Sequence, residues 1–340
     1  MATRKEVADM AGVSEATVSR VMNGVGPIRE STRQRVLEAA QKLNYHMNAI
    51  ASSFARGRSG NLGVVIPHVP KVRLFSTYYF SEMMSGIGEA ARAHGCGLLL
   101  LYRDPAEPYD YVSLFRTQRI DGCLVLGASS LPSETAGIAA MAEEGLPFCL
   151  IDQSFDDPRA STVVAAHKTG SYLAVKHLIE SGCRRIGFLN GSPHYSTSAD
   201  RLAGYIQALK ESGLGFDPRL LYEGNYSMTS GRAAAAAVYA DRGKLDAIFA
   251  ANDRMAIGLL QGLREKGCRA PADIPIVGYD DSDASRMSDP PLTTVKVPFY
   301  EMGLTAADML LERIPDWLGE ASVFRRTMPT ELVIRKSSAR

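Results

Sequence analysis

Four residues that could hydrogen-bond a hydroxylated small molecule follow apolar runs typical of buried strands. They are Asp152, Arg201, Asn252 and Asp280. Two carboxylates, an amide and a guanidinium supply the paired donors and acceptors that vicinal hydroxyl groups require. Because ligands bind beyond the carboxyl ends of parallel strands, we expect the four side chains to converge on a cleft. The aspartates lack a partner set for acid–base chemistry, so the pattern predicts binding and not catalysis.

Residues beside these four leave alternatives open. Asp253 and Asp281 stand next to two of them, but aspartates at such positions also cap helices and turns. Tyr79 and Phe80 stand at the start of a predicted helix. Their rings could stack on the ligand or pack between two lobes of the protein.

An alternation of strand and helix patterns from residue 61 onward must position these side chains. Strand-like apolar runs cover 62–66, 98–102, 123–126 and 148–151, and then 186–190, 220–223, 247–250 and 274–279. Helical patterns cover 81–94, 134–144, 170–180, 201–211, 230–240 and 255–266, so that Arg201 is expected to open a helix. Such alternation predicts parallel sheets with helices on both faces, and its two series predict two doubly wound lobes.

The expected α/β core therefore has an N-terminal and a C-terminal lobe. We assign residues 61–163 and 296–323 to the N-terminal lobe, and residues 164–295 and 324–340 to the C-terminal lobe. A last strand is expected over 330–334.

Residues 1–46 contain three short helical patterns. A capping box begins at Thr3, and Gly12 can adopt the positive φ that ends the first helix. Ser14 is a good N-cap for a second helix that runs to about Asn23, and a capping box at Ser31 is expected to open the third. Two helices joined through so tight a turn indicate a helix-turn-helix.

The second helix carries side chains suited to the major groove of DNA. Arg20 can reach a guanine edge or a phosphate, Glu15 can accept from a cytosine amino group, and Ala16 can meet a thymine methyl. The first 60 residues contain nine Lys and Arg against five Asp and Glu, which favours a polyanionic partner. The alternatives are a small helical domain with solvated polar faces and ordinary variation in surface charge.

Residues 47–60 have the pattern of a hinge. The stretch 48–56 could form two helical turns, which are too short to be stable alone in water. Gly57, Ser59 and Gly60 then mark a flexible junction. A segment balanced between disorder and helix suits a switch, because its ordering can be tied to DNA binding.

The first fifty residues resemble the headpiece of the lactose-repressor (LacI/GalR) family. The resemblance is ungapped and runs through Ala11-Gly12-Val13-Ser14, Thr17-Val18-Ser19-Arg20-Val21-Met22-Asn23 and Leu43-Asn44-Tyr45. It implies that residues 15, 16 and 20 read bases. It also implies that the residues placing the helix on phosphates are Ser14, Thr17, Ser19 and Asn23.

The same resemblance assigns roles to the hinge. In the family, paired hinge helices enter the minor groove, and an apolar residue from each separates a central base step. Asn48 and Phe54 fall on the DNA-contacting positions here, with Phe54 where Leu is usual. Met47 replaces the usual Pro, which implies a looser start to the hinge helix. The alternative for Phe54 is an apolar contact with the core.

The resemblance extends to the core, which is also similar to periplasmic sugar-binding proteins. It rests on Arg201-Leu202-Ala203-Gly204, Ala251-Asn252-Asp253 and Ile276-Val277-Gly278-Tyr279-Asp280-Asp281. The family's effector contacts fall on Asp152, Arg201, Asn252 and Asp280. Asn252 is typical of sugar-responsive members, so a sugar is the expected effector and a nucleobase or nucleoside is the alternative.

These features together predict a DNA-binding transcription regulator, most simply a repressor. Its fold is expected to be an all-α helix-turn-helix headpiece followed by a periplasmic-binding-protein-like core of two doubly wound, parallel-sheet lobes. A single headpiece reads only a half-site, so a homodimer on a near-palindromic operator is expected. Effector binding between the lobes would change hinge spacing and thereby operator affinity.

Other classes of protein fit less well. A GxGxxA match at Gly86 lies inside a helical pattern and is weak as a dinucleotide fingerprint, and neither a catalytic motif nor a cofactor is expected. The five cysteines are scattered and the six histidines show no metal-ligand spacing. Without an apolar leader or an apolar run near 18 residues, a cytoplasmic protein is expected and not a membrane protein or an exported sugar receptor.

Overall fold

The computed structural model describes residues 2–24, 26–45, 58–68, 73–316 and 319–339. The first of these segments hold three helices, α1 (Arg4–Ala11), α2 (Glu15–Asn23) and α3 (Glu30–Lys42). The expected capping box at Thr3 is confirmed, Gly12 is left-handed with φ 66°, and the Ser14 side chain caps α2 by accepting from the Thr17 N–H. The helices share a small apolar core of their own that includes Val7, Val18 and Val36.

The prediction of a capping box at Ser31 is wrong. Helix α3 begins one residue earlier, at Glu30, and its N-cap is Arg29, which makes no side-chain capping bond. Ser31 therefore already lies inside the first turn, where its hydroxyl cannot act as an N-cap. The acidic Glu30 in that turn complements the helix dipole. Asn48, Phe54 and Met47 fall outside the described residues.

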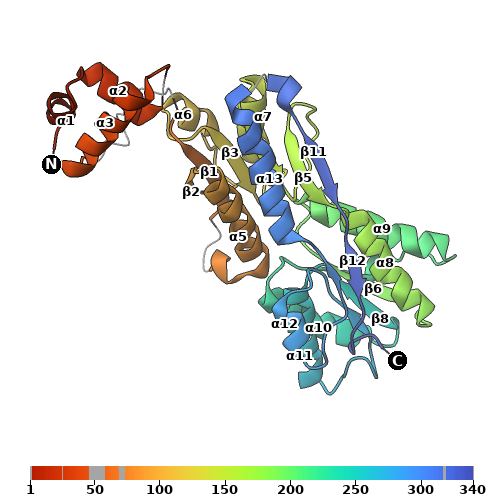
Figure 1. Ribbon diagram of the computed structural model, residues 1–340. Helices are drawn as coiled ribbons and strands as arrows, with labels where there is room; N and C mark the ends of the chain where they lie inside the picture. Colours follow the sequence, from red (N-terminus) through yellow and green to blue (C-terminus); the bar gives the residue numbers. More distant parts are fainter. Residues whose placement is uncertain (1, 25, 46–57, 69–72, 317–318, 340) are drawn as a thin grey trace.

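The N-terminal lobe is built on a six-stranded sheet in the order β11-β5-β4-β3-β1-β2, with every neighbour parallel. Its strands are β1 (Asn61–Pro67), β2 (Gly97–Arg103), β3 (Gly122–Leu126), β4 (Phe148–Ile151), β5 (Ser161–Ala165) and β11 (Arg325–Met328). Its helices are α5 (Tyr78–Ala93), α6 (Tyr111–Arg116), α7 (Pro132–Glu143) and α13 (Phe299–Arg313). Helices α5 and α13 pack together on one face (Figure 1), and α6 and α7 cover the other.

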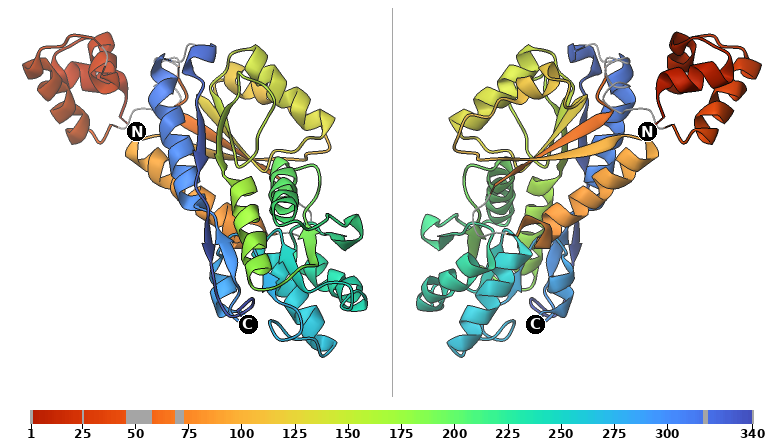
Figure 2. Two further views of the ribbon diagram at one scale, coloured as in Figure 1. Left: turned by 90° about the vertical axis from the view of Figure 1, so that its right-hand side faces the viewer. Right: turned by 90° about the vertical axis from the view of Figure 1, so that its left-hand side faces the viewer.

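The C-terminal lobe repeats this design on a smaller parallel sheet in the order β7-β6-β8-β9. Its strands are β6 (Ile186–Asn190), β7 (Leu221–Glu223), β8 (Ala247–Ala250) and β9 (Ile276–Val277). Its helices are α8 (His167–Glu180), α9 (Ser196–Glu211), α10 (Met228–Ala240), α11 (Asp253–Glu265) and α12 (Asp283–Met287). Helix α8 packs against α9, and α10 packs against α11 (Figure 2).

The expected lobe boundaries need correction where the chain crosses back. The expected C-terminal lobe includes residues 325–328. These residues form β11, which pairs with β5 at the edge of the N-terminal sheet. That sheet also continues to Ala165 through β5, two residues beyond the expected limit. The last strand, β12 (Glu331–Val333), pairs antiparallel with β10 (Thr294–Lys296). The crossing segments are short and have no alternating pattern, so periodicity did not separate them.

Arg201 does not open a helix as expected. It lies in the second turn of α9, which begins five residues earlier, at Ser196. The first turn, Ser196 to Asp200, is polar and hides the helical period. Among the described residues, no helix is long and apolar enough to cross a lipid bilayer.

Candidate functional site

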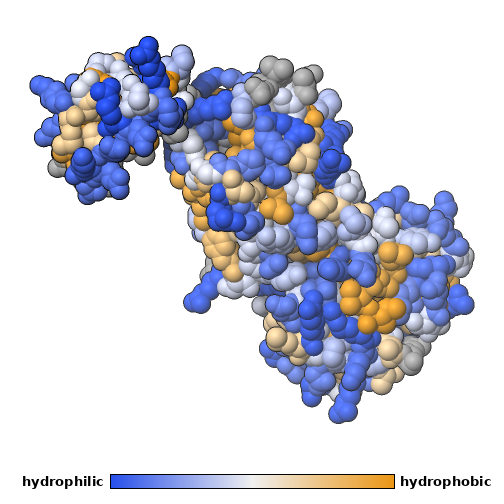
Figure 3. Space-filling model, viewed as in Figure 1, coloured by the Kyte–Doolittle hydropathy of each residue, from blue (hydrophilic) through white to orange (hydrophobic). Residues whose placement is uncertain are grey.

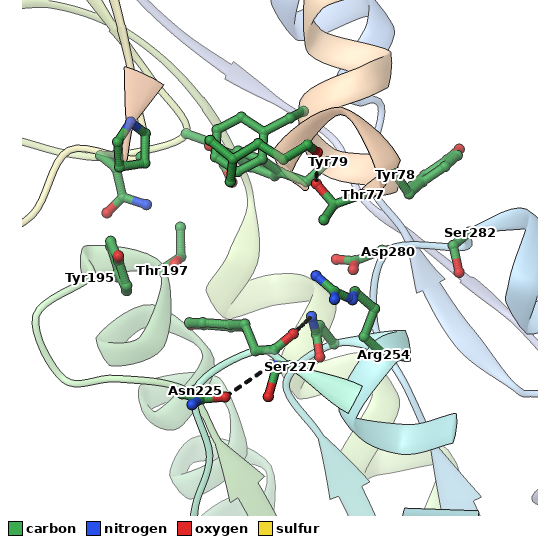
Figure 4. Close-up of a pocket in the computed structure, with 18 of the residues that line it drawn as sticks. Thr77, Tyr78, Tyr79, Tyr195, Thr197, Asn225, Ser227, Arg254, Asp280 and Ser282 are labelled. Atoms are coloured by element: carbon green, nitrogen blue, oxygen red, sulfur yellow. Dashed lines mark hydrogen bonds between the residues drawn. The ribbon is translucent and has the colours of Figure 1, made fainter. Parts of the chain in front are cut away.

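A cavity of about 230 Å³ lies between the two lobes (Figure 4). All six residues that the sequence predicts for ligand binding line it, and these are Tyr79, Phe80, Asp152, Arg201, Asn252 and Asp280. Five of them follow a strand or open a helix, three in the N-terminal lobe and two in the C-terminal lobe, so the cavity is lined from both sheets. Their role as ligand contacts stays a prediction.

Arg201 is the buried cation of this cavity. Its side chain stacks on the Tyr279 ring, with the guanidinium carbon 4.3 Å from the ring centre. Arg201 Nη2 lies 3.3 Å from His167 Nδ1, and His167 Nε2 lies 2.7 Å from the Asp152 carboxylate. The carboxylate of Asp152 therefore fixes the orientation of the His167 ring. Through His167 it also balances the positive charge of Arg201.

One donor of Arg201 is unused. Its Nε–H is buried and has no hydrogen-bond partner among the described residues. A buried donor without a partner costs about 1–3 kcal/mol.

Asp280 occupies a strained position at the edge of the same cavity. Its φ is 117°, a conformation that non-glycine residues rarely adopt, and its N–H donates to the Val295 carbonyl at 2.7 Å. Burial raises the pKa of Asp280 well above its ordinary value, the neighbouring Asp253 raises it further, and Arg201 opposes both. The backbone thus holds the carboxyl at the cavity despite an electrostatic penalty.

Asn252 has a structural function as well as a place in the cavity. Its side-chain oxygen accepts from the Met255 N–H at 2.9 Å and so caps α11, while its amide nitrogen donates to the Tyr226 carbonyl at 3.1 Å. The amide is therefore held in one orientation. Asn252, and not Asp253, is the N-cap of α11.

Asp253 instead lies fully buried behind the cavity. Its carboxylate accepts from the Ser282 N–H and hydroxyl, both at 2.8 Å, and from the Thr294 hydroxyl at 2.6 Å. Burial raises the pKa of Asp253 to about 7, although these hydrogen bonds act to lower it. The residue ties the start of α11 to the segments that carry Asp280 and β10.

Aromatic rings line the cavity from both lobes. Tyr79 and Phe80 make an edge-to-face pair with centroids 4.8 Å apart, and Tyr79 makes another with Phe299 at 5.1 Å. They therefore pack within the N-terminal lobe and also line the cavity, and stacking on a ligand stays a prediction. Tyr195 and Tyr226 form a pair at 5.9 Å in the opposite lobe.

The sequence did not single out several other lining residues. They are Gln153, Tyr195, Thr197, Asn225, Tyr226 and Ser227, together with Arg254, which stands beside the Asn252-Asp253 pair. Asn225 and Tyr226 follow β7 as directly as Asn252 follows β8, so the rule for strand ends could have found them. Tyr195 and Thr197 sit around the early start of α9, which periodicity missed.

Hydrogen bonds join the two lobes beside the cavity. The Gln153 side-chain oxygen accepts from both the N–H and the hydroxyl of Ser196, each at 3.0 Å. The Ser130 N–H donates to the His194 carbonyl at 2.8 Å. Both contacts connect a loop of the N-terminal lobe to the start of α9 or to the loop before it, so they link the two lobes.

The headpiece residues expected to meet DNA lie on one helix. Glu15, Ala16 and Arg20 are exposed on α2, as base-reading side chains must be. Ser14 is exposed as well, and Thr17, Ser19 and Asn23 are half-buried. The Asn23 amide donates to the Ser19 carbonyl at 2.8 Å, which reinforces the end of the helix. DNA contact by each residue stays a prediction.

The described residues include no cluster of three or more His, Cys, Asp and Glu that could hold a metal ion. All five cysteines are free thiols. Burial raises the pKa of the Cys123 thiol to about 12, as expected for a reduced side chain in an apolar core.

Known proteins match this chain in two ways, as family models over parts of it and as relatives over 99% of it. Residues 3–48 match bacterial regulatory proteins of the lacI family, and residues 175–338 match a periplasmic binding protein-like domain. The transcriptional repressor PurR of Aliivibrio salmonicida is 33% identical over 339 residues, 99% of either chain. PurR of Photobacterium profundum is 33% identical over 339 residues, 99% of this chain and 98% of the relative.

Solved structures agree with these relatives. The lac repressor dimer bound to operator and the anti-inducer ONPF superposes with a TM-score of 0.83 at 29% identity, over 100% of this chain and 99% of that one. The regulator CelR in complex with cellobiose gives 0.73 at 29% identity, over 99% and 100%. The expected family and two-part fold are therefore confirmed. The chain belongs to the lacI family of bacterial regulatory proteins and is a DNA-binding transcriptional repressor, not an enzyme.

Proposed function

We propose that a sugar of monosaccharide size, bound between the core lobes, controls the affinity of the headpiece for a near-palindromic operator. The observation that carries the proposal is the convergence of the Arg201 guanidinium and the Asp280 carboxyl on one cavity. A guanidinium and a carboxyl together donate to and accept from neighbouring hydroxyls of one ring. Sites of this kind reject ligands that leave their polar groups unpaired.

The size of the cavity favours a small ligand. At about 230 Å³ it lies below the roughly 300–1,000 Å³ of pockets for drug-sized molecules. One ring fits better than two. A lacI-family regulator from Enterococcus faecium, similar in structure with a TM-score of 0.69, binds ribose, and CelR binds the disaccharide cellobiose. Both support a sugar, and the restriction to one ring rests on the cavity volume.

A nucleobase is the second candidate. The rings of Tyr79 and Phe80 from one lobe and Tyr195 and Tyr226 from the other could enclose a flat heterocycle. The relatives at 33% identity are repressors named PurR, which keeps this candidate open. Against it, the carboxyl pair of Asp152 and Asp280 matches the many donors of a polyol better than the few of a base.

Ligand binding would act on the interface between the lobes. The bonds from Gln153 to Ser196 and from Ser130 to His194 lie beside the cavity. A ligand that contacts both lobes would change how firmly these loops are held together. Coupling between two sites is typically about 1–3 kcal/mol, which corresponds to roughly 5- to 150-fold in operator affinity.

The edge of the N-terminal sheet supports a homodimer. Strand β2 is the last strand of that sheet, and its Leu98 and Tyr102 are 39% and 50% exposed. Apolar residues gather over this part of the core, whereas hydrophilic residues cover most of the headpiece on the face drawn (Figure 3). An uncovered apolar edge strand invites pairing with a second copy.

Titration calorimetry of the full chain with pentoses, hexoses and nucleobases tests the effector class. We expect heat of binding from a sugar and none from the bases, and the Asp280→Asn variant should lose it. Asp283→Asn, an exposed aspartate on the neighbouring helix α12, is the matched control and should bind normally. Binding of a base but not of any sugar would refute the sugar and establish the second candidate.

A further inference from the structure

An ion pair joins the first two helices of the headpiece on their outer surface. Arg4 Nε donates to the Glu15 carboxylate at 3.0 Å. Arg4 is the first residue of α1 and Glu15 the first residue of α2, the helix expected to enter the major groove. The two side chains are 51% and 46% exposed, so both can meet a partner.

Folding of the headpiece does not account for this pair. Exposed ion pairs contribute only about 0–1 kcal/mol. Helix α1 already has its capping box, and the three helices have a buried core of their own. A positive charge at the start of a helix also opposes the helix dipole, so Arg4 does not favour α1 by its position.

The ion pair would reduce the electrostatic repulsion between the Glu15 carboxylate and DNA. A carboxylate brought into the groove is repelled by a duplex that carries one negative charge per roughly 1.7 Å. A free glutamate also loses about 1.5–2 kcal/mol of side-chain freedom when it is fixed on a base. Arg4 compensates the charge of Glu15 and fixes its carboxylate before DNA arrives.

The guanidinium of Arg4 has hydrogen-bond donors that Glu15 does not use. Only its Nε–H has a partner among the described residues, which leaves the two terminal nitrogens of the guanidinium. Arginine donors of this kind bind backbone phosphates. One side chain could therefore hold Glu15 and contact the DNA backbone next to the base that Glu15 reads.

We propose that Arg4 is a specificity-determining residue that positions Glu15 for a cytosine amino group while its terminal nitrogens bind the adjacent phosphate. The proposal rests on the base-reading function proposed for Glu15. Its chemical consequence is that the two residues act as one unit, so removing either erases the same base preference.

Selection from a randomised operator library with the full chain tests this unit, followed by dissociation constants for the selected site and its single-base changes. We expect Glu15→Gln and Arg4→Ala to lose preference at the same base pair of each half-site, by about fivefold or more. Arg4→Lys should restore part of it. Lys5→Ala, the neighbouring exposed cation on α1, is the matched control and should weaken all sequences equally.

Two results would overturn the proposal. The first is an Arg4→Ala variant that behaves like Lys5→Ala, with every base preference intact. The second is an Arg4→Ala/Glu15→Gln double variant that discriminates less well than Glu15→Gln alone, because Arg4 would then act independently. If Glu15→Gln itself keeps the wild-type preferences, the base-reading function of Glu15 fails, and that outcome is separate from the failure of Arg4.

Discussion

The carboxylate of Asp121 accepts a hydrogen bond from the backbone of Gly60, the last residue of the predicted hinge (residues 47–60), where the hinge joins the core. Gly60 N–H donates to one carboxylate oxygen and Ser59 N–H to the other, both at 2.7 Å. Gly60 has φ 74°, a conformation that glycine adopts without strain. Asp121 immediately precedes β3, so a displacement of the N-terminal sheet moves the end of the hinge with it.

Asp121→Ala should therefore weaken communication between the two ends of the protein. Without the carboxylate, Ser59 and Gly60 lose two hydrogen bonds to the core. A movement of the core then displaces the end of the hinge less, and the headpiece with it. We expect the ligand-induced change in operator affinity to shrink several-fold, while calorimetry finds ligand affinity unchanged. Asp156→Ala, an exposed aspartate of the same lobe, is the control. A full ligand response in Asp121→Ala would show that this anchor is dispensable.

Arg20→Ala should relax operator specificity. If Arg20 reads a base, its loss costs about 1–3 kcal/mol on the preferred site and little on random DNA. Fluorescence anisotropy with both duplexes measures the difference. Arg35→Ala, an exposed arginine on α3, should not change the ratio of the two affinities. Unchanged discrimination in Arg20→Ala would place this residue on a phosphate instead.

Asp280→Asn should separate the two functions of the chain. A ligand group left without its partner costs about 1–3 kcal/mol, so ligand affinity is expected to fall by roughly 5- to 150-fold. Operator affinity without ligand should stay at the wild-type value, because Asp280 lies in the core and not on the headpiece. Calorimetry and anisotropy on the same preparation measure both. A normal ligand response would mean that the effector binds elsewhere.

Stability should depend on pH through Asp253. Its pKa rises from about 4 in the unfolded chain to about 7 in the folded protein, so its carboxyl holds a proton more firmly when folded. The resulting stabilisation is complete below about pH 4 and is lost as the pH rises through about 7.

Asp253→Asn cannot titrate, so it should gain stability relative to the wild type over that same pH interval. Denaturant unfolding at several pH values measures the difference, with Asp283→Asn as the exposed control. A constant difference from pH 4 to pH 7 would mean that Asp253 titrates normally in the folded protein.

Strong local signals made most of the fold predictable. The runs at 148–151, 186–190 and 247–250 coincide with β4, β6 and β8 because buried parallel strands are continuously apolar. Ser14 and Gly12 placed the turn between α1 and α2 because capping chemistry is local. Short edge elements such as β10 and β11 were missed or misassigned, since only the neighbouring strand specifies them.

The rule that ligands bind at strand ends made part of the cavity predictable from the sequence. Asp152 follows a strand of the N-terminal sheet, Asn252 and Asp280 follow strands of the C-terminal sheet, and ligands bind beyond the carboxyl ends of such strands. His167, which connects Arg201 to Asp152, gave no signal, because it begins a helix after a strand that the sequence pattern did not predict. The pairing of Arg4 with Glu15 was equally invisible, since it depends on how two helices pack and not on either sequence alone.

The most direct test of the account is operator affinity measured on the full-length protein with and without a saturating sugar identified by calorimetry. We predict a change of fivefold or more, corresponding to a coupling of about 1–3 kcal/mol, and its loss in Asp280→Asn. Identical affinity with and without the bound sugar would contradict control of DNA binding from the cavity between the lobes.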